Sequence, residues 1–481
     1  MIVAIAPPPL FWLALPLAVL CAGAQLAQAD SSTGADSRHS LGDALAMAYN
    51  HSGLLEQNRA LLRAADEDVA AAYAILRPLI AWSASASHDH SRRSSALSGN
   101  RVTSNDTTPI NLGLNLELLL YDGGGARRAV DAAQEVVLAT RQRLISIEQS
   151  VLLAAVQAFM AVRRDTELVQ LRENNLRLLE QELRATRDRF EVGELTRTDV
   201  SLAEAALEGA RAELAMATGD LASSQEAYLA AVGNRPDSLE VPQQLPQLAA
   251  SLDDAKAAAL ARHPDLVRAQ HDIRAAEFTI ERARAQLRPT LRLNSRLSAQ
   301  DDTKRPDYSL GGTLSLDLTQ PIYRGGQLSA TLRRTMQQRD AARGNLHLVR
   351  HAIEQQVGIA WAQLAATQAQ RSASEEQVRA QRLAYEGVSE ETALGARTIL
   401  DVLNAEQDLL QAEVRYINTI SDEYVAAYAL LATMGLLTVE HLGLQVEQYD
   451  PATYYEQVRE APAIGSARGR QLDQMLRRIG K

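Results

Sequence analysis

The sequence is poor in cysteine, in aromatic side chains and in positive charge. Its 481 residues include 1 Cys and only 3 Trp, 13 Tyr and 4 Phe. A compact core of this length would normally contain more of these large anchors, so a thin, elongated fold is favoured. Lys and Arg number 49 against 59 Asp and Glu, which gives a formal net charge of -10. That sign disfavours a protein that wraps the phosphate backbone of nucleic acid.

The first 29 residues contain no charged side chain. An apolar run from Leu10 to Leu20 is followed by Ala27-Gln28-Ala29, the small-x-small pattern of a cleavage site. We therefore predict a secretory signal peptide over residues 1–29. The alternative is a membrane-spanning anchor, but Pro16 interrupts the run and no basic stop signal follows it. Cleavage after Ala29 would remove Cys21, which excludes disulfide bonds and thiolate chemistry in the mature chain.

The sequence contains an internal repeat. Tyr121-Asp122-Gly123-Gly124 returns as Tyr323-Arg324-Gly325-Gly326, and Gly193 and Asp199 return as Gly395 and Asp401. Nearer the N-terminus the spacing between the copies is nine residues longer, because Arg77-Pro78 returns as Arg288-Pro289. The extra residues fall in the Ser/Arg/Asn-rich stretch 91–108, which its composition predicts to be a loop.

The repeat sets the predicted division of the chain. After the signal peptide we expect a flexible N-terminal segment at 30–40, a first helix-strand-strand-helix repeat at 41–234, a linker at 235–251, a second repeat at 252–436, and a C-terminal segment and tail at 437–481.

Each copy contains a segment with the alternation of a β-strand. Leucines occupy every second position from Leu112 to Leu120, and again at Leu314, Leu316 and Leu318, with mostly polar residues between them. A weaker strand pattern precedes each, around 82–90 and 291–298. The sequence therefore predicts four strands per chain, with one apolar and one polar face.

Residues 126–192 contain neither Gly nor Pro. A continuous helix over this stretch would be about 100 Å long, far beyond a globular helix. Apolar residues recur at three-four spacing, as in Leu144, Ile147 and Val151, and the second copy repeats the pattern at Leu346, Val349 and Ile353. That spacing is typical of coiled-coil packing. A coiled-coil rod or adaptor hairpin would explain these helices, but it would not explain the strands.

A strand of about ten residues with one leucine face can cross a bilayer at a tilt. Inside the hydrocarbon no water can bond to the backbone, so every strand edge must pair with another strand. Membrane barrels need at least about eight strands, so four strands from one chain cannot close one. Several chains would have to combine their strands, and three copies would give a wall of twelve. The polar face, with Asn115, Glu117, Arg292 and Asp317, would then line water. The alternative is a sheet half-buried on a soluble core.

At these residues the chain resembles the TolC family of outer-membrane efflux proteins. The resemblance is carried by the tandem repeat, by the Tyr-x-Gly-Gly motifs and by two turns, at 192–200 and 394–405, and it runs from about Leu41 to Leu444. It implies an α+β membrane protein, a homotrimer with a shared 12-stranded barrel in the outer membrane of a Gram-negative bacterium and a long α-helical tunnel across the periplasm. The implied partners are a periplasmic adaptor (a membrane fusion protein) and an inner-membrane ABC or RND transporter.

The resemblance implies an exit duct that conducts drugs or secreted polypeptides. The residues 449–456 are similar to those of members that serve type I protein secretion. A periplasmic coiled-coil adaptor or scaffold without a pore remains the alternative function.

The resemblance also implies site residues at the two turns. Thr198 and Asp199 would latch to Arg397, and Asp401 with Asn404 would form a constriction ring. The residues expected to dock the adaptor are Val192, Gly193, Leu195, Thr196, Leu394, Gly395 and Thr398. The chain departs from the family pattern at Asn404, where a second aspartate is usual, and at Thr392, where a tyrosine helps the latch. Simple helix N-capping is the alternative role for Asp199 and Asp401.

Other motifs do not indicate chemistry. No Lys-Ser/Thr follows the glycines at Gly123-Gly124 and Gly325-Gly326, so we interpret them as strand-to-helix joints rather than phosphate loops. His347 and His351 lie at helical i, i+4 spacing without a third ligand nearby, and His88 and His90 flank the expected loop. We predict no metal site, no cofactor and no catalytic residues, and therefore a passive conduit rather than an enzyme.

Overall fold

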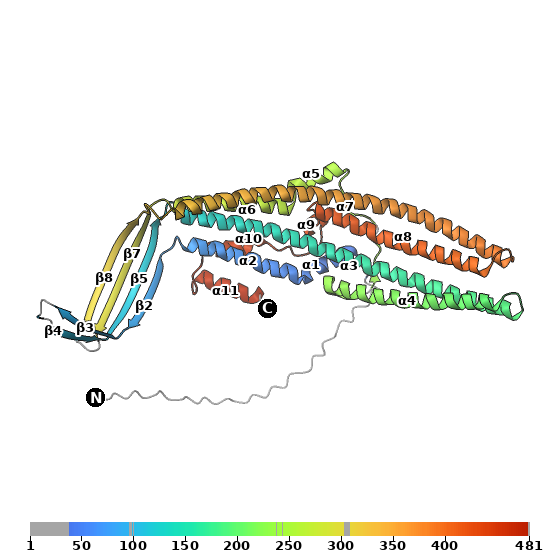
Figure 1. Ribbon diagram of the computed structural model, residues 1–481, viewed down its shortest axis with the longest axis horizontal. Coiled ribbons are helices and arrows are strands. Elements are labelled where there is room, and N and C mark those ends of the chain that lie inside the picture. Colours follow the sequence, from blue (N-terminus) through green and yellow to red (C-terminus); the bar gives the residue numbers. More distant parts are fainter. Residues whose placement is uncertain are drawn as a thin grey trace, which may run out of the picture. The chain divides into compact units, whose positions relative to one another are not determined.

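The computed structural model describes residues 38–479, except 96–98, 100, 237, 243 and 303–307 (Figure 1). The predicted signal peptide at 1–29 lies outside the described residues. From Arg38 onward the chain forms one compact unit, and its elements appear twice in the same order.

The first copy contains α1 Leu41–His51, α2 Gly53–Ala74, β2 Leu79–Ala86, β5 Pro109–Tyr121, α3 Gly125–Glu191 and α4 Arg197–Val232. The second contains α5 Leu252–Arg262, α6 Pro264–Ala285, β7 Thr290–Asp302, β8 Tyr308–Thr319, α7 Gln327–Ala393 and α8 Ile399–Thr433. Both α3 and α7 have 67 residues, which confirms the very long helices.

The four predicted strands form one antiparallel sheet in the order β2-β5-β7-β8. The register aligns Leu114 of β5 with Trp82 of β2 and with Leu297 of β7. Because side chains alternate between the two faces of a sheet, this register gathers Trp82 of β2 and most leucines of β5, β7 and β8 on the same face, whereas Leu79 of β2 lies opposite Glu117. Within one chain β2 and β8 are the edges, each paired on one side only.

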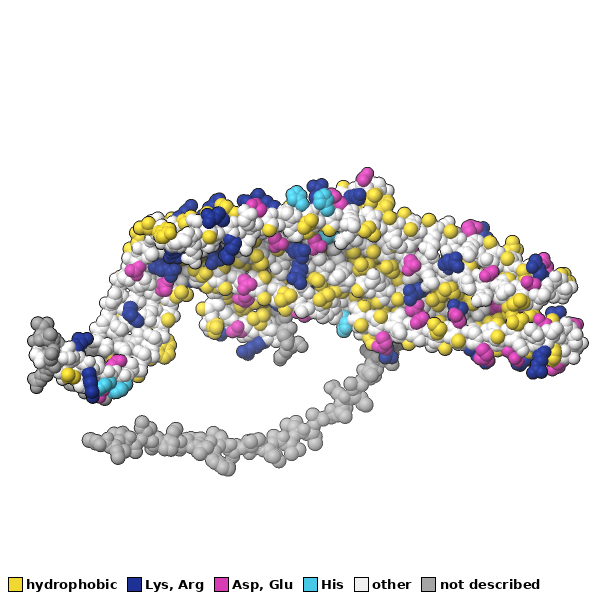
Figure 2. Space-filling view, viewed as in Figure 1, with side chains coloured by type: hydrophobic (Ala, Val, Ile, Leu, Met, Phe, Trp, Pro, Cys, Tyr) yellow, Lys and Arg dark blue, Asp and Glu magenta, His cyan; other side chains and the backbone are white. Residues whose placement is uncertain are grey.

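The composition of the stretch 91–108 predicted a loop, and this prediction is wrong. The stretch contains most of a second, two-stranded sheet made by β3 Asp89–Ser95 and β4 Arg101–Thr107. The ladder bonds join backbone groups, so a hairpin needs no apolar alternation when no core covers it. Figure 2 shows Arg and His side chains over this end of the molecule. The nine additional residues of the first copy therefore lengthen a β-hairpin.

A large apolar cluster joins the helices of both copies. Leu45 of α1, Phe159 of α3, Tyr228 of α4 and Leu431 of α8 are all buried in it. The rings of Phe159 and Tyr228 lie 6.5 Å apart between centroids. Among the described helices α3 alone is long and apolar enough to cross a membrane by composition, but its apolar residues Leu152 and Val156 are buried in this cluster.

Outside the repeats, short elements tie the ends of the unit to its centre. The two-residue strands β1 Arg38–His39 and β6 Ser238–Leu239 pair in parallel, so part of the segment 30–40 contacts the segment 235–251. After α8 the chain forms α9 Val439–Leu442, α10 Pro451–Val458 and α11 Ala467–Ile479.

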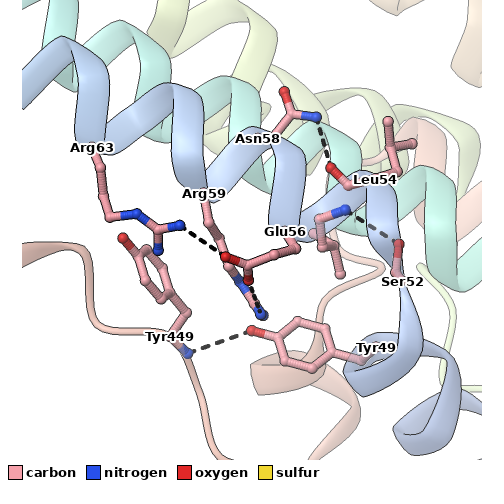
Figure 3. Close-up of polar contacts among 9 residues, drawn as sticks. Tyr49, Ser52, Leu54, Glu56, Asn58, Arg59, Arg63 and Tyr449 are labelled. Atoms are coloured by element: carbon pink, nitrogen blue, oxygen red, sulfur yellow. Dashed lines mark hydrogen bonds and ion pairs between the residues drawn. The ribbon is translucent and has the colours of Figure 1, made fainter. Parts of the chain in front are cut away.

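The C-terminal segment packs onto α2 through tyrosine and arginine side chains (Figure 3). The guanidinium of Arg59 lies 5.1 Å from the ring centre of Tyr49 and 5.3 Å from that of Tyr449. Farther along, the hydroxyl of Tyr454 donates to Glu67 at 2.7 Å, and Arg77 donates to the Ala461 carbonyl at 2.7 Å. Cation–π contacts and charge-assisted hydrogen bonds thus hold this segment along the length of α2.

Candidate functional site

The first candidate region is the apolar face of the sheet. Its large side chains are exposed in the single chain: Trp82 is 76% exposed, Leu314 is 72% and Leu310 is 80%. Exposed apolar residues that form a continuous strip across four strands are rare on a protein surrounded by water. This strip of apolar side chains therefore needs an apolar environment other than the protein's own core.

The opposite face is polar and internally paired. Arg292 of β7 forms an ion pair with Glu117 of β5. Asn294 donates to Asp317 at 2.5 Å, and Ser315 donates to the same carboxylate at 2.9 Å. The predicted water-lining residues thus lie together on one side of the sheet, and their hydrogen bonds bridge neighbouring strands.

The strand-to-helix joints turn sharply at paired glycines. Gly123 and Gly124 have φ values of +68° and +87°, and Gly325 and Gly326 have +57° and +83°. Only Gly123 is also crowded, because a Cβ there would meet the Arg288 side chain at 2.7 Å. The Gly123 carbonyl accepts from that same arginine at 2.9 Å. This contact ties the first joint to Arg288, which lies two residues before the start of β7.

The second candidate region is the pair of helical turns at the end of α3 and α7 away from the sheet (Figure 1). Each turn closes in the same way: Gly193 donates to the Phe190 carbonyl, and Gly395 donates to the Thr392 carbonyl, both at 3.0 Å. Positive φ at these glycines, +83° and +79°, allows the helix to stop and reverse. The two turns therefore share one backbone geometry.

The predicted docking residues mostly present their side chains to solvent. Val192 is 73% exposed and Leu394 is 87% exposed, whereas Leu195 is partly buried. Figure 2 shows acidic and basic side chains around both turns. The turns thus combine an apolar residue at the tip with mixed charge beside it.

Asp199 and Asp401 take part in capping boxes. The Thr196 hydroxyl caps α4 and the Thr398 hydroxyl caps α8, while each aspartate accepts from the backbone N–H of its threonine, at 2.8 Å for Asp199 and 3.0 Å for Asp401. Hydrogen bonds from these threonines lower the pKa of both carboxyl groups. The largest contribution comes from the Thr196 hydroxyl for Asp199 and from the Thr398 backbone N–H for Asp401. These contacts therefore favour the ionised form of both aspartates in the single chain.

The latch residues are not joined within a single chain. Arg397 pairs with Glu391 of its own turn at 2.9 Å, and both side chains are about half exposed. In the part of the chain that the structure describes, Arg397 makes no ion pair with Asp199, and Thr198 is exposed. Thr392 is buried and donates to the Val388 carbonyl. A latch to Asp199 would have to form with a neighbouring copy.

On α8, Asp401 is partly buried and Asn404 is exposed. Sequence reasoning missed Glu406, which lies two residues beyond Asn404 and is 5% exposed. Its signal was present: Ile399, Val402 and Glu406 continue the three-four spacing of buried positions. A carboxylate at a coiled-coil core position is unusual and marks a specific role.

Two of the four histidines that the sequence singled out, His88 and His351, have ordinary partners. His88 contacts Asp106 at 3.2 Å and Thr108 at 3.0 Å, and His351 lies 3.5 Å from Glu354. Within the described ranges, no group of three His, Cys, Asp or Glu side chains is placed to hold a metal ion.

Comparison with known proteins places these features in context. A family model described as outer membrane efflux protein matches residues 44–234 and 257–436. The outer membrane efflux protein BepC of Brucella suis biovar 1 (strain 1330) is 36% identical over 419 residues, which cover 87% of this chain and 90% of BepC. The alkaline protease secretion protein AprF of Pseudomonas aeruginosa is 26% identical over 335 residues, covering 66% of this chain and 68% of AprF.

Solved structures agree in fold. The CmeC outer membrane channel of Campylobacter jejuni superposes with a TM-score of 0.72 at 16% identity, covering 87% of this chain and 89% of CmeC. At that identity the likeness concerns the fold alone, including the α+β arrangement of long helices and a small sheet.

Proposed function

Because the chain belongs to the outer membrane efflux protein family, we propose that it works as a homotrimer whose sheets close one barrel of twelve strands in the outer membrane. The protein is an outer-membrane export channel of an efflux or secretion system, and its helices extend into the periplasm. The sheet is the observation that supports the trimer. Its leucine face is exposed and its edge strands β2 and β8 are each open on one side, and a bilayer tolerates no open edge.

The channel works with partner proteins in its export system. As the finer assignment we propose a periplasmic adaptor that docks on the turns and an inner-membrane ABC or RND transporter that supplies the energy. The conducted substrates would be drugs or secreted polypeptides. The alternative of a pore-less periplasmic adaptor is not supported, because the family match and BepC are outer membrane efflux proteins.

We also propose the roles of the turn residues. Arg397 of one chain would bind Thr198 and Asp199 of the next, and Asp401 with Asn404 would form the narrow ring at the end of the helical tunnel. The exposure of Arg397, Thr198 and Asn404 supports this proposal, since a contact between chains needs side chains that solvent can reach. Like charges crowded into a ring attract cations. The exposed Val192 and Leu394 tips would contact the adaptor.

The internal repeat also suggests how the chain is divided. We propose two pore-forming repeats at 41–234 and 252–436, separated by the linker 235–251 and followed by the C-terminal segment 437–481. The linker and the C-terminal segment would form a belt around the middle of the helices.

Fractionation tests the proposed function. We expect the protein in the outer-membrane fraction, released by detergent, and chemical cross-linking of that extract should yield a band of three chains. Purified trimers should form pores in planar lipid bilayers. Recovery as a monomer in the soluble periplasm, with no pore activity, would overturn the proposal.

Replacing the latch arginine tests the gate. Arg397→Ser should lengthen open periods and raise single-channel conductance in planar bilayers. Its exposed pair with Glu391 contributes under about 1 kcal/mol, so the turn itself should survive. A change in conductance would therefore report a contact outside that turn.

A matched control lies in the other turn, where Arg189 pairs with Glu194 at 3.0 Å. Arg189→Ser removes a pair of the same kind that is also largely exposed, and it should leave conductance unchanged. Equal effects of the two variants would exclude a specific latch at Arg397.

Replacing the ring aspartate tests the constriction. In the same planar-bilayer recordings Asp401→Ala should weaken block of the pore by multivalent cations, whereas undiminished block would place the ring elsewhere.

A further inference from the structure

Glu406 occupies an unusual place near the turns. It lies on the second turn of α8, is 5% exposed, and faces α3 of the first copy. Its neighbour Leu403 packs against the apolar cluster that α3 and α4 form with Leu179, Leu183 and Leu207. The first turns of α8 are thus seated on the α3–α4 hairpin, with a carboxyl group at the contact.

Only one oxygen of this carboxyl group has a partner. The Asn175 side chain of α3 donates to Oε1 at 2.6 Å. The other oxygen, Oε2, is buried and has no hydrogen-bond partner in the structure. A buried ionised carboxylate normally requires a cation or several donors, so this site suits a neutral, protonated carboxyl.

The charges around Glu406 do not supply a cation. On α3, Glu182 repels it, while Arg172 is paired with Glu213 of α4 at 2.8 Å. On α7, Tyr385 is a partly buried phenol whose own pKa is raised, first by desolvation and then by Glu406 and Glu182. On α8 itself, Glu413 is paired with Arg382 of α7 at 2.6 Å.

Burial and the Glu182 charge raise the pKa of Glu406 from 4.5 to about 7, although the Asn175 hydrogen bond lowers it in part. Beside the carboxyl lies a cleft of about 460 Å³ whose lining includes Arg172, Asn404 and Glu406. The cleft gives water a route to the carboxyl once α8 moves away from α3.

We propose that Glu406 is a positioning residue whose neutral carboxyl clamps α8 onto α3, and that its ionisation releases the second helical hairpin from the first. The inference rests on the proposed channel function, because release at this point would loosen the α8 end that carries Asp401 and Asn404. It adds a proton-controlled contact inside each chain to the contacts between chains.

The direction of the pH effect follows from linkage. In the clamped state the carboxyl titrates near pH 7, and in a hydrated, released state it should titrate near its ordinary value of 4.5. The clamp is therefore fully favoured below about pH 4.5, and raising the pH favours release by up to about tenfold per pH unit until about pH 7. Above that pH both states are ionised and the balance no longer changes. Asp401 should not contribute, because its pKa is lowered.

The experiment measures hairpin separation directly. Cysteines replace Arg197 and Ala396 at the two turns, in a chain whose Cys21 is removed, and spin labels on purified trimers report distances by electron-electron resonance from pH 4.5 to 8. We expect a short-distance population at low pH and a longer one that grows up to about pH 7. Glu406→Gln should keep the short distance at every pH, because an amide preserves the neutral clamp.

Two further variants sharpen the test. Glu182→Gln removes the nearby negative charge and should move the transition to lower pH. Glu208→Gln, on an exposed residue of α4, should behave like the parent chain. The proposal is overturned if Glu406→Gln keeps the parent pH dependence, or if distances in the parent chain do not change with pH. Because this readout needs no conduction, its failure in trimers that form pores would refute the clamp and leave the channel function intact.

Discussion

Leu314→Arg should remove the protein from the outer membrane. Leu314 lies in the middle of β8, on the leucine face, and is 72% exposed in the single chain. A lipid-facing arginine near the bilayer midplane costs about 2–4 kcal/mol per copy, and a trimer would carry three of them. The expected result is a severe loss of trimer from the outer-membrane fraction, measured by fractionation and cross-linking.

The neighbouring residue provides the control. Ser315 precedes the next leucine but lies on the polar face, where its hydroxyl donates to Asp317. Ser315→Arg introduces the same charge beside a carboxylate, and we expect trimers at close to the parent level. If both variants accumulate equally, the leucine face does not contact lipid, and the barrel proposal fails with it.

Phe159→Ala should destabilise the helical part of the protein. The Phe159 side chain is fully buried where α1, α3, α4 and α8 meet, and it lies against Tyr228. Truncating a buried phenylalanine to alanine costs about 3–5 kcal/mol, through lost burial and the cavity left behind. We expect a clearly lower unfolding midpoint, followed by the helical circular dichroism signal of trimers in detergent.

The same helix contains a second phenylalanine that serves as control. Phe190 lies near the turn and is 43% exposed. Phe190→Ala should change the midpoint little, because a half-exposed side chain loses less burial. An equal shift from both variants would show that the cluster around Phe159 does not hold the helices together.

Much of the architecture could be predicted from local patterns. The absence of Gly and Pro from 126–192 predicted a helix that the structure bounds at Gly125 and Glu191, and the leucine alternation predicted β5 and β8. These signals are local, because helix breakers and side-chain period act within a few residues. The internal repeat predicted the order of the other elements, because a helix or strand recognised in one copy indicates the same element at the matching position of the other copy.

What the sequence could not give depends on tertiary contacts. Composition misjudged the β3–β4 hairpin, because backbone ladder bonds do not depend on side-chain polarity. The burial of Glu406 depends on α3, which is more than two hundred residues away in the chain, as its contact with Asn175 shows. The placement of the C-terminal tyrosines on α2 likewise depends on arginines of a distant helix, such as Arg59.

The equal length of α3 and α7, at 67 residues each, restricts how this protein can change. Adding one residue to a helix advances everything beyond it by about 1.5 Å and rotates it by roughly a third of a turn. An insertion in one helix alone would leave the two turns of each chain at different heights and facing different directions. A surface assembled from alternating turns would then become uneven, so tolerated insertions should occur in matched pairs, one in α3 and one in α7.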